Sequence, residues 1–278
     1  MKRTISIIIA ALVVMFAAFI ADAPLSPTAT AQNAAKKQLY NLTIVHVRPE
    51  LWLEYTDFIK NTVNPLQIKG GLKAKYVWRP DRGDRFELYN FVPVESYAAM
   101  GVTMGPDPIQ TALGSTEATA LFYQQQRKFQ AGTEILTIEA LPDISWTNPK
   151  LQGQPQLALM RWTRIAPGRS TEVEDFLKNY DVPARRKTVE QSNMLGQWRY
   201  RVRFGGDVNR YLMIRPMASY AELDDGGTKG LGQILGAAEY KKITDQLPKG
   251  TILQDEAYLM HFRPDLSILP QPTTAEKK

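Results

Sequence analysis

The segment Pro93-Val94-Glu95-Ser96-Tyr97-Ala98 recurs 123 residues later as Pro216-Met217-Ala218-Ser219-Tyr220-Ala221. Three further segments repeat in the same order: Pro49, Glu54, Asp57, Phe58, Lys60 and Asn61 at an offset of 118, and Leu113-Gly114 and Pro142-Asp143-Ile144-Ser145 at an offset of 122. This period is far too long for a solenoid. Because the offset is nearly constant, we interpret the chain as two copies of one domain of about 110 residues.

Each copy has the same predicted order of elements. In the first, strands are predicted at 40–47, 72–79, 85–92 and 132–141, and helices at 51–63 and 111–129. In the second, strands are predicted at 156–165, 194–204, 208–215 and 251–262, and helices at 170–190 and from 219 to 246. The helices follow apolar spacing of i, i+3, i+4 and i+7, and the strands follow alternation between turn residues. The order β-α-β-β-α-β is that of a ferredoxin-like domain.

The start of the second copy has a distinctive local sequence. A strand is followed by Ala166-Pro167-Gly168-Arg169 and then by an amphipathic helix containing Glu174-Asp175-Phe176-Leu177, while Pro216–Ala221 ends the third strand. This pattern resembles the dimeric α/β-barrel superfamily, which includes antibiotic-biosynthesis monooxygenases, NIPSNAP-like proteins and EthD-like proteins. The resemblance implies an α+β fold in which two four-stranded antiparallel sheets pack as a barrel within one chain. It also leaves room for a further homodimer.

The chain is predicted to have five parts: a signal peptide (1–31), a first repeat (38–146), a linker (147–154), a second repeat (155–268) and a disordered tail (269–278). The signal peptide is indicated by Lys2 and Arg3, by the apolar run Ile5–Ala21 and by Ala29-Thr30-Ala31. We therefore expect a periplasmic or secreted protein that begins at Gln32. The alternative is an uncleaved membrane anchor.

The composition excludes several kinds of site. The 278 residues include no cysteine and two histidines, so disulfides, thiolate metal sites and thiol nucleophiles are absent. His46 and His261 fall in strands of different copies, and we therefore predict no metal, haem or other cofactor. The net charge of +6 favours an anionic ligand. No dinucleotide fingerprint or nucleic-acid motif is present, so the expected partner is a small molecule, not a nucleic acid or a membrane.

The second strand of each copy separates aromatic from basic side chains. Tyr76 and Trp78 alternate with Lys73, Lys75 and Arg79, and Trp198 and Tyr200 alternate with Arg199, Arg201 and Arg203. Successive side chains of a strand point to opposite faces, so we expect the aromatic face to pack beneath the helices. The basic face would then point between the two sheets and bind an anion. In the alternative interpretation these cations are solvated or pair with Glu87, Glu134 and Glu139.

The candidate site follows from these faces. The predicted ligand-binding residues are Tyr76, Trp78, Arg164, Trp198, Arg199, Arg201 and Arg203, and His46, the repeat counterpart of Arg164, is the candidate catalytic base. Three functions stay open: an exported protein that binds a small anionic or aromatic molecule, a cofactor-independent monooxygenase or isomerase of the kind the superfamily contains, and an interaction protein of the cell envelope. A cavity lined by convergent polar groups would favour the first two.

Overall fold

The computed structural model describes residues 38–270, except residues 83, 101–106 and 225–228. The predicted signal peptide (1–31) and positions 271–278 of the predicted tail lie outside the described residues. Among the helices of the described part, none has both the length and the apolar character that crossing a membrane requires.

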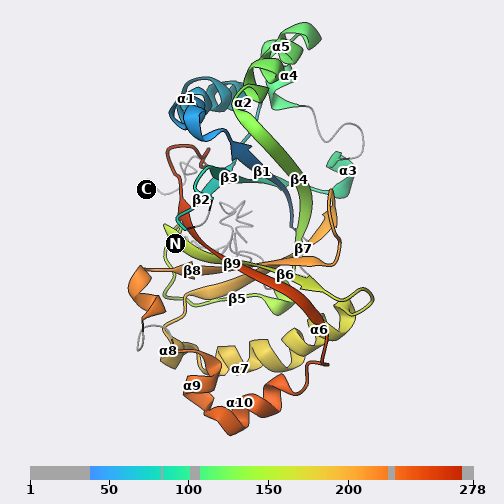
Figure 1. Cartoon of the computed structure of the whole chain (residues 1–278), viewed down its shortest axis with the longest axis vertical. Helices are drawn as coiled ribbons and strands as arrows, with labels where there is room; N and C mark the ends of the chain where they lie inside the picture. Colours follow the sequence, from blue (N-terminus) through green and yellow to red (C-terminus); the bar gives the residue numbers. More distant parts are fainter. Residues whose placement is uncertain (1–37, 83, 101–106, 225–228, 271–278) are drawn as a thin grey trace, which may run out of the picture.

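The strands of the described chain form an antiparallel barrel (Figure 1). Its order is β4-β1-β3-β2-β9-β6-β8-β7, and β7 pairs with β4 to close it. The first half contributes β1 (Leu39–Val47), β2 (Tyr76–Pro80), β3 (Glu87–Val94) and β4 (Gln130–Ala140), and the second contributes β6 (Leu157–Ile165), β7 (Gly196–Phe204), β8 (Arg210–Met217) and β9 (Ile252–Phe262). A short strand, β5 (Trp146–Thr147), joins the halves and pairs with β7. The prediction of an α/β barrel within one chain is confirmed.

Helices cover the outer faces of the barrel, with each half carrying its own set (Figure 1). The first half has η2 (Pro49–Leu51), α1 (Trp52–Phe58), η3 (Ile59–Val63), α2 (Asn64–Lys69), α3 (Tyr97–Met100), α4 (Pro108–Leu113), α5 (Thr116–Arg127) and η4 (Pro142–Ile144). The second has α6 (Ser170–Phe176), η5 (Leu177–Asp181), α7 (Val182–Lys187), α8 (Val189–Ser192), η6 (Tyr220–Leu223), α9 (Leu231–Leu235) and α10 (Ala237–Thr244).

The first long helix of each half contains a π-helical turn at the same place in the repeat. These turns are η3 and η5, and their first residues, Ile59 and Leu177, are 118 positions apart. Pro65 and Pro183 follow at the start of the next α-helix, where a missing backbone N–H is tolerated. The helix predicted at 51–63 therefore continues through α2, whose polar side chains reach the sheet.

Each sheet packs against a core on its inner face and on part of its outer face. The barrel interior holds the largest core cluster, which includes Phe91, Met160, Phe262 and the strand aromatics. Two further clusters lie between sheet and helices, one around Tyr55 and Phe58 and one around Val173 and Met194.

The prediction that the aromatic faces lie beneath the helices is wrong. Trp78, Trp198 and Tyr200 belong to the cluster inside the barrel, so the basic residues that alternate with them point outward to the helices. Alternation reveals which side chains share a face. When both faces are covered, it does not reveal which one is the inside.

Candidate functional site

The sheet and helices of the first half enclose a cavity of about 410 Å³. Its floor is the outer face of the β4-β1-β3-β2 sheet, and its walls come from α1, η3, α2, α4 and α5. The apolar part of the wall includes Val45, Tyr55, Ile59, Val63, Ile109 and Phe122. Small-molecule sites typically have volumes of roughly 300–1,000 Å³ and mostly apolar walls, so this cavity has the dimensions of a ligand site.

The cavity reaches from an exposed rim to a buried lysine. Arg127, Thr133 and Ile135 lie at the exposed rim, whereas Lys75 is only 4% exposed. The Lys75 backbone is held by two hydrogen bonds with Ile268, in which its N–H donates at 2.8 Å and its carbonyl accepts at 2.9 Å. The segment after β9 therefore fixes the start of β2 and the place of this lysine.

The amine of Lys75 contacts two neutral side chains of α2. Its Nζ donates to Asn64 Oδ1 at 2.6 Å and to Gln67 Oε1 at 2.7 Å. Asn64 is itself fixed, because its Nδ2 donates to the carbonyl of Leu266 at 3.1 Å. Burial removes the hydration of the ammonium ion and lowers the pKa of Lys75 to about 7. Both protonation states are therefore accessible near neutral pH.

Two tyrosines of the wall are held by neighbouring polar groups. The hydroxyl of Tyr55 accepts from Gln130 Nε2 at 3.2 Å. Tyr123 donates to Asp107 Oδ2 at 2.9 Å, and Asp107 also accepts from the Ile109 backbone N–H at the start of α4. Burial raises the pKa of both tyrosines, so they stay neutral. These bonds preorganise the wall without adding charge to it.

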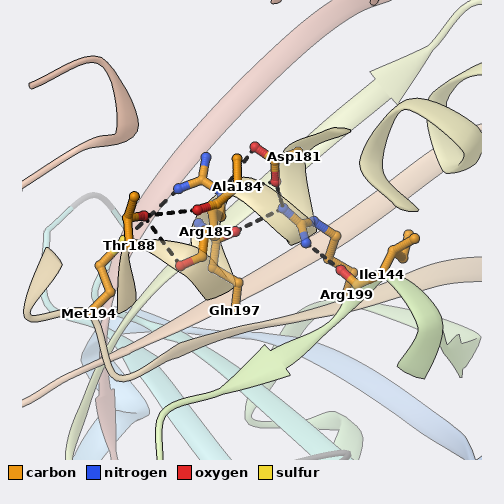
Figure 2. Close-up of polar contacts among 8 residues, drawn as sticks. All are labelled: Ile144, Asp181, Ala184, Arg185, Thr188, Met194, Gln197 and Arg199. Carbon is orange, nitrogen blue, oxygen red and sulfur yellow. Dashed lines mark hydrogen bonds and ion pairs between the residues drawn. The ribbon is translucent and has the colours of Figure 1, made fainter. Parts of the chain in front are cut away.

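At the equivalent place in the second half, side chains of η5, α7 and β7 form a polar network (Figure 2). Nη2 of Arg199 donates to Asp181 Oδ2 at 2.9 Å and to Gln197 Oε1 at 2.8 Å, and its Nη1 donates to the carbonyl of Ile144. Asp181 also accepts from Nε of Arg185. Burial opposes ionisation of Asp181, but the two arginines outweigh it and lower the pKa of the carboxyl group.

The sequence-predicted ligand residues lie in three different environments. Tyr76, Trp78 and Trp198 point into the barrel core, and each is at most 2% exposed. Trp198 Nε1 donates to Thr147 Oγ1 at 3.0 Å. Arg199 belongs to the network of the second half. None of these four side chains lines the cavity of the first half.

Arg201 and Arg203 lie at the seam where β7 pairs with β4. Both bind the fully buried carboxylate of Glu139, and Arg201 also binds Glu174 at 3.1 Å. Pairing with Glu139, the alternative interpretation of these cations, is what the structure shows. The two arginines thus join the halves of the chain.

The other two predicted residues lie at one end of the barrel. Arg164 pairs with Asp207 at 2.7 Å, and His46 Nδ1 lies 3.0 Å from Glu87 Oε1. His46, Glu87 and Asp84 each offer a potential metal ligand within 4.8 Å of the others.

Arg164 itself lines a second cavity of about 370 Å³, together with Arg210, whose guanidinium lies 4.4 Å from the centre of the Trp162 ring. Arg210 pairs with Glu134 at 2.7 Å, so acids and bases at this end largely pair with each other.

The cavity was not predicted from the sequence, where Lys75 resembles the other basic residues of its strand. The residues around Lys75 do indicate that its amine is buried. This lysine stands between Ala74 and Tyr76, and it faces Asn64 and Gln67, which are spaced to share a helix face. A lysine flanked by Ala74 and Tyr76 and placed opposite two helix amides indicates a buried amine.

Neither a family model nor a curated protein sequence matches the chain. Among solved structures, an anthrone oxidase-like protein matches with a TM-score of 0.52 and 10% identity, over 86% of this chain and 98% of that chain. A candidate monooxygenase from Lactobacillus acidophilus (TM-score 0.49, 9% identity, 84% and 97% coverage) and the chlorite dismutase from Candidatus Nitrospira defluvii (0.46, 8%, 82% and 92%) also match. The first match concerns the fold alone. The chain therefore has the tandem ferredoxin-like fold of the dimeric α/β barrels.

Proposed function

We propose that the protein binds one small, largely apolar molecule in the cavity between the sheet and helices of its first half. The observation that carries this proposal is the cavity itself, with a volume of about 410 Å³, apolar walls and a buried amine at its inner end. The corresponding space of the second half is occupied by Arg199 and its partners. One ligand per chain is therefore expected.

Ligand binding is tested with a panel of neutral mono- and bicyclic aromatic compounds that includes 2-naphthamide. Binding is followed by thermal shift and by calorimetry. Ile59→Trp fills the cavity and should abolish binding, whereas Leu177→Trp, at the equivalent position of the second half, should leave it intact. Circular dichroism establishes that both variants are folded. The absence of binding by any member of the panel, or unchanged binding to Ile59→Trp, contradicts the proposal and favours an interaction protein without a ligand.

The buried amine favours a second candidate function, that of a cofactor-independent oxygenase or isomerase. Near neutral pH a fraction of Lys75 is unprotonated and can accept a proton from an acidic C–H or O–H group. Because the fold is shared with an anthrone oxidase-like protein, anthrone is a suitable first substrate. Oxygen uptake with the wild-type protein, lost in Lys75→Met, would support an enzyme. Binding without turnover would leave the protein as a binder.

We also propose that the protein is exported. Support comes from the basic, apolar and small-residue order of residues 1–31. N-terminal sequencing of protein recovered from the periplasm or the medium should yield a chain that starts at Gln32. A chain that starts at Met1 would instead indicate an anchor.

A further inference from the structure

We infer that the ligand of the first-half cavity is a carboxylic acid, and that its carboxylate binds the protonated amine of Lys75 with uptake of a proton by the protein. This inference rests on the proposed function and names the class of molecule that the site selects.

The charges that line the cavity point to an anion. Among the described residues of its wall, the charged side chains are Lys75 and Arg127, and both are cationic. Arg127 lies at the exposed rim, where a positive charge attracts anions to the opening. The cavity therefore contributes no carboxylate of its own to neutralise a buried ammonium ion.

The partners of Lys75 differ in charge from the partners of the buried arginine and of the seam arginines. Arg199 has the carboxylate of Asp181 as its partner, and Arg203 has that of Glu139. The side-chain acceptors of Lys75 are the neutral amide oxygens of Asn64 and Gln67. Buried cations usually require an opposite charge, and a ligand carboxylate in the cavity would provide it.

The number of N–H groups fits this role. An ammonium group has three donors, and two of those of Lys75 are used by α2. The third can donate to a carboxylate oxygen in the cavity, while Ile59, Val63 and Phe122 contact the apolar body of the ligand. The neutral amine, in contrast, has only two N–H groups, and both are already bonded.

The other titratable groups around the cavity do not compete for this proton. Tyr55 and Tyr123 stay neutral because burial raises their pKa values, and Arg127 lies at the exposed rim. Asp107, behind the wall, accepts from Tyr123 and from the backbone at the start of α4. A carboxylate beside Lys75 raises the pKa of that amine above its value of about 7 in the free protein. Binding above pH 7 therefore takes up a proton, and affinity falls up to about tenfold per pH unit.

The test compares two probes of the same shape, 2-naphthoate and its neutral analogue 2-naphthamide. Calorimetry near pH 8 in phosphate and in Tris, two buffers with different ionisation enthalpies, gives the number of protons taken up. We expect uptake to approach one proton for 2-naphthoate and to be zero for 2-naphthamide. This measurement uses the wild-type protein and needs no variant.

Two variants locate the effect. Lys75→Met should weaken 2-naphthoate binding at least tenfold, abolish its proton uptake and keep 2-naphthamide binding. Lys73→Met, which removes an exposed lysine from the same segment, should change neither probe. Binding of 2-naphthamide together with weak or uptake-free binding of 2-naphthoate overturns this inference but leaves the proposed function intact. Failure of both probes and of the rest of the neutral panel contradicts the proposed function itself.

Discussion

Asp181 Oδ2 lies 2.9 Å from Nη2 of Arg199, and this buried ion pair occupies the place of two valines in the first half. Val63 precedes Asp181 by the repeat offset of 118, and the sheet register relates Val77 to Arg199. Both valines belong to the core cluster beneath the helices. The same position of one fold thus accepts either an apolar pair or a charged pair.

Removal of one member of this pair should be costly. Arg199→Val leaves a buried carboxylate paired with Arg185 alone among the described residues, and we expect a loss of about 3–5 kcal/mol in the free energy of unfolding. The double variant Asp181→Val with Arg199→Val recreates the valine pair and should recover at least about 2 kcal/mol of that loss. Urea denaturation measures all three proteins. A double variant no more stable than Arg199→Val would refute this reading.

The seam between the halves depends on Glu139. Glu139→Gln removes the negative charge shared by Arg201 and Arg203, and because this carboxylate is fully buried, unfolding should become easier by about 3–5 kcal/mol. The control is Asp255→Asn, which disrupts an exposed pair with Arg161 and should cost less than about 1 kcal/mol. Equal losses in the two variants would show that the seam is not held by this carboxylate.

The stability of the protein should depend on pH through Lys75. The amine has a pKa of about 7 when folded and an ordinary value of 10.5 when unfolded. Between these values the unfolded chain binds more protons, so stability rises with pH by up to about 1.4 kcal/mol per unit. Below pH 7 both states are protonated and the slope disappears. Denaturation of wild type and Lys75→Met from pH 6 to about 9.5 should give a steeper rise for wild type; parallel curves would count against a buried, neutral amine.

Gly70 allows α2 and α4 to approach each other. A Cβ at this residue would lie 1.8 Å from the carbonyl oxygen of Pro108, a backbone atom that cannot rotate away. Gly70→Ala should displace α4 with its cavity residue Ile109, lower stability by about 1–3 kcal/mol and weaken 2-naphthamide binding. Gly230→Ala has its nearest added contact at 3.9 Å and serves as the control. Unchanged stability of Gly70→Ala would mean that α4 adjusts freely.

The fold could be predicted because the sequence contains the same order of strands and helices twice, so each copy supports the assignment of the other. The segments around Pro93 and Pro216 end equivalent strands, as the structure confirms. The side of the sheet on which each residue lies could not be predicted, since aromatic side chains suit both the barrel interior and the space beneath the helices.

The candidate site was harder to predict than the fold. Its wall combines residues from β1, η3, α2, α4 and α5, and no local motif links Lys75 to Phe122 or Ile109. Arg199, Arg201 and Arg203 alternate along one strand, a pattern that favours a shared anion site. Asp181 meets Arg199 only when η5 packs against β7, and Glu139 meets Arg203 only when β4 pairs with β7 to close the barrel.

Because the barrel closes within one chain, its two sheets can acquire different substitutions. A barrel made from two identical subunits must carry the same side chains on both sheets, so each substitution is made twice. Here the two sheets mutate separately, and one space could be sealed by Asp181 and Arg199 while the other stayed hollow beside Val63. Because the halves are covalently linked, they can take different roles. The second half can serve as a rigid support, while the first half can change its cavity lining to suit a ligand.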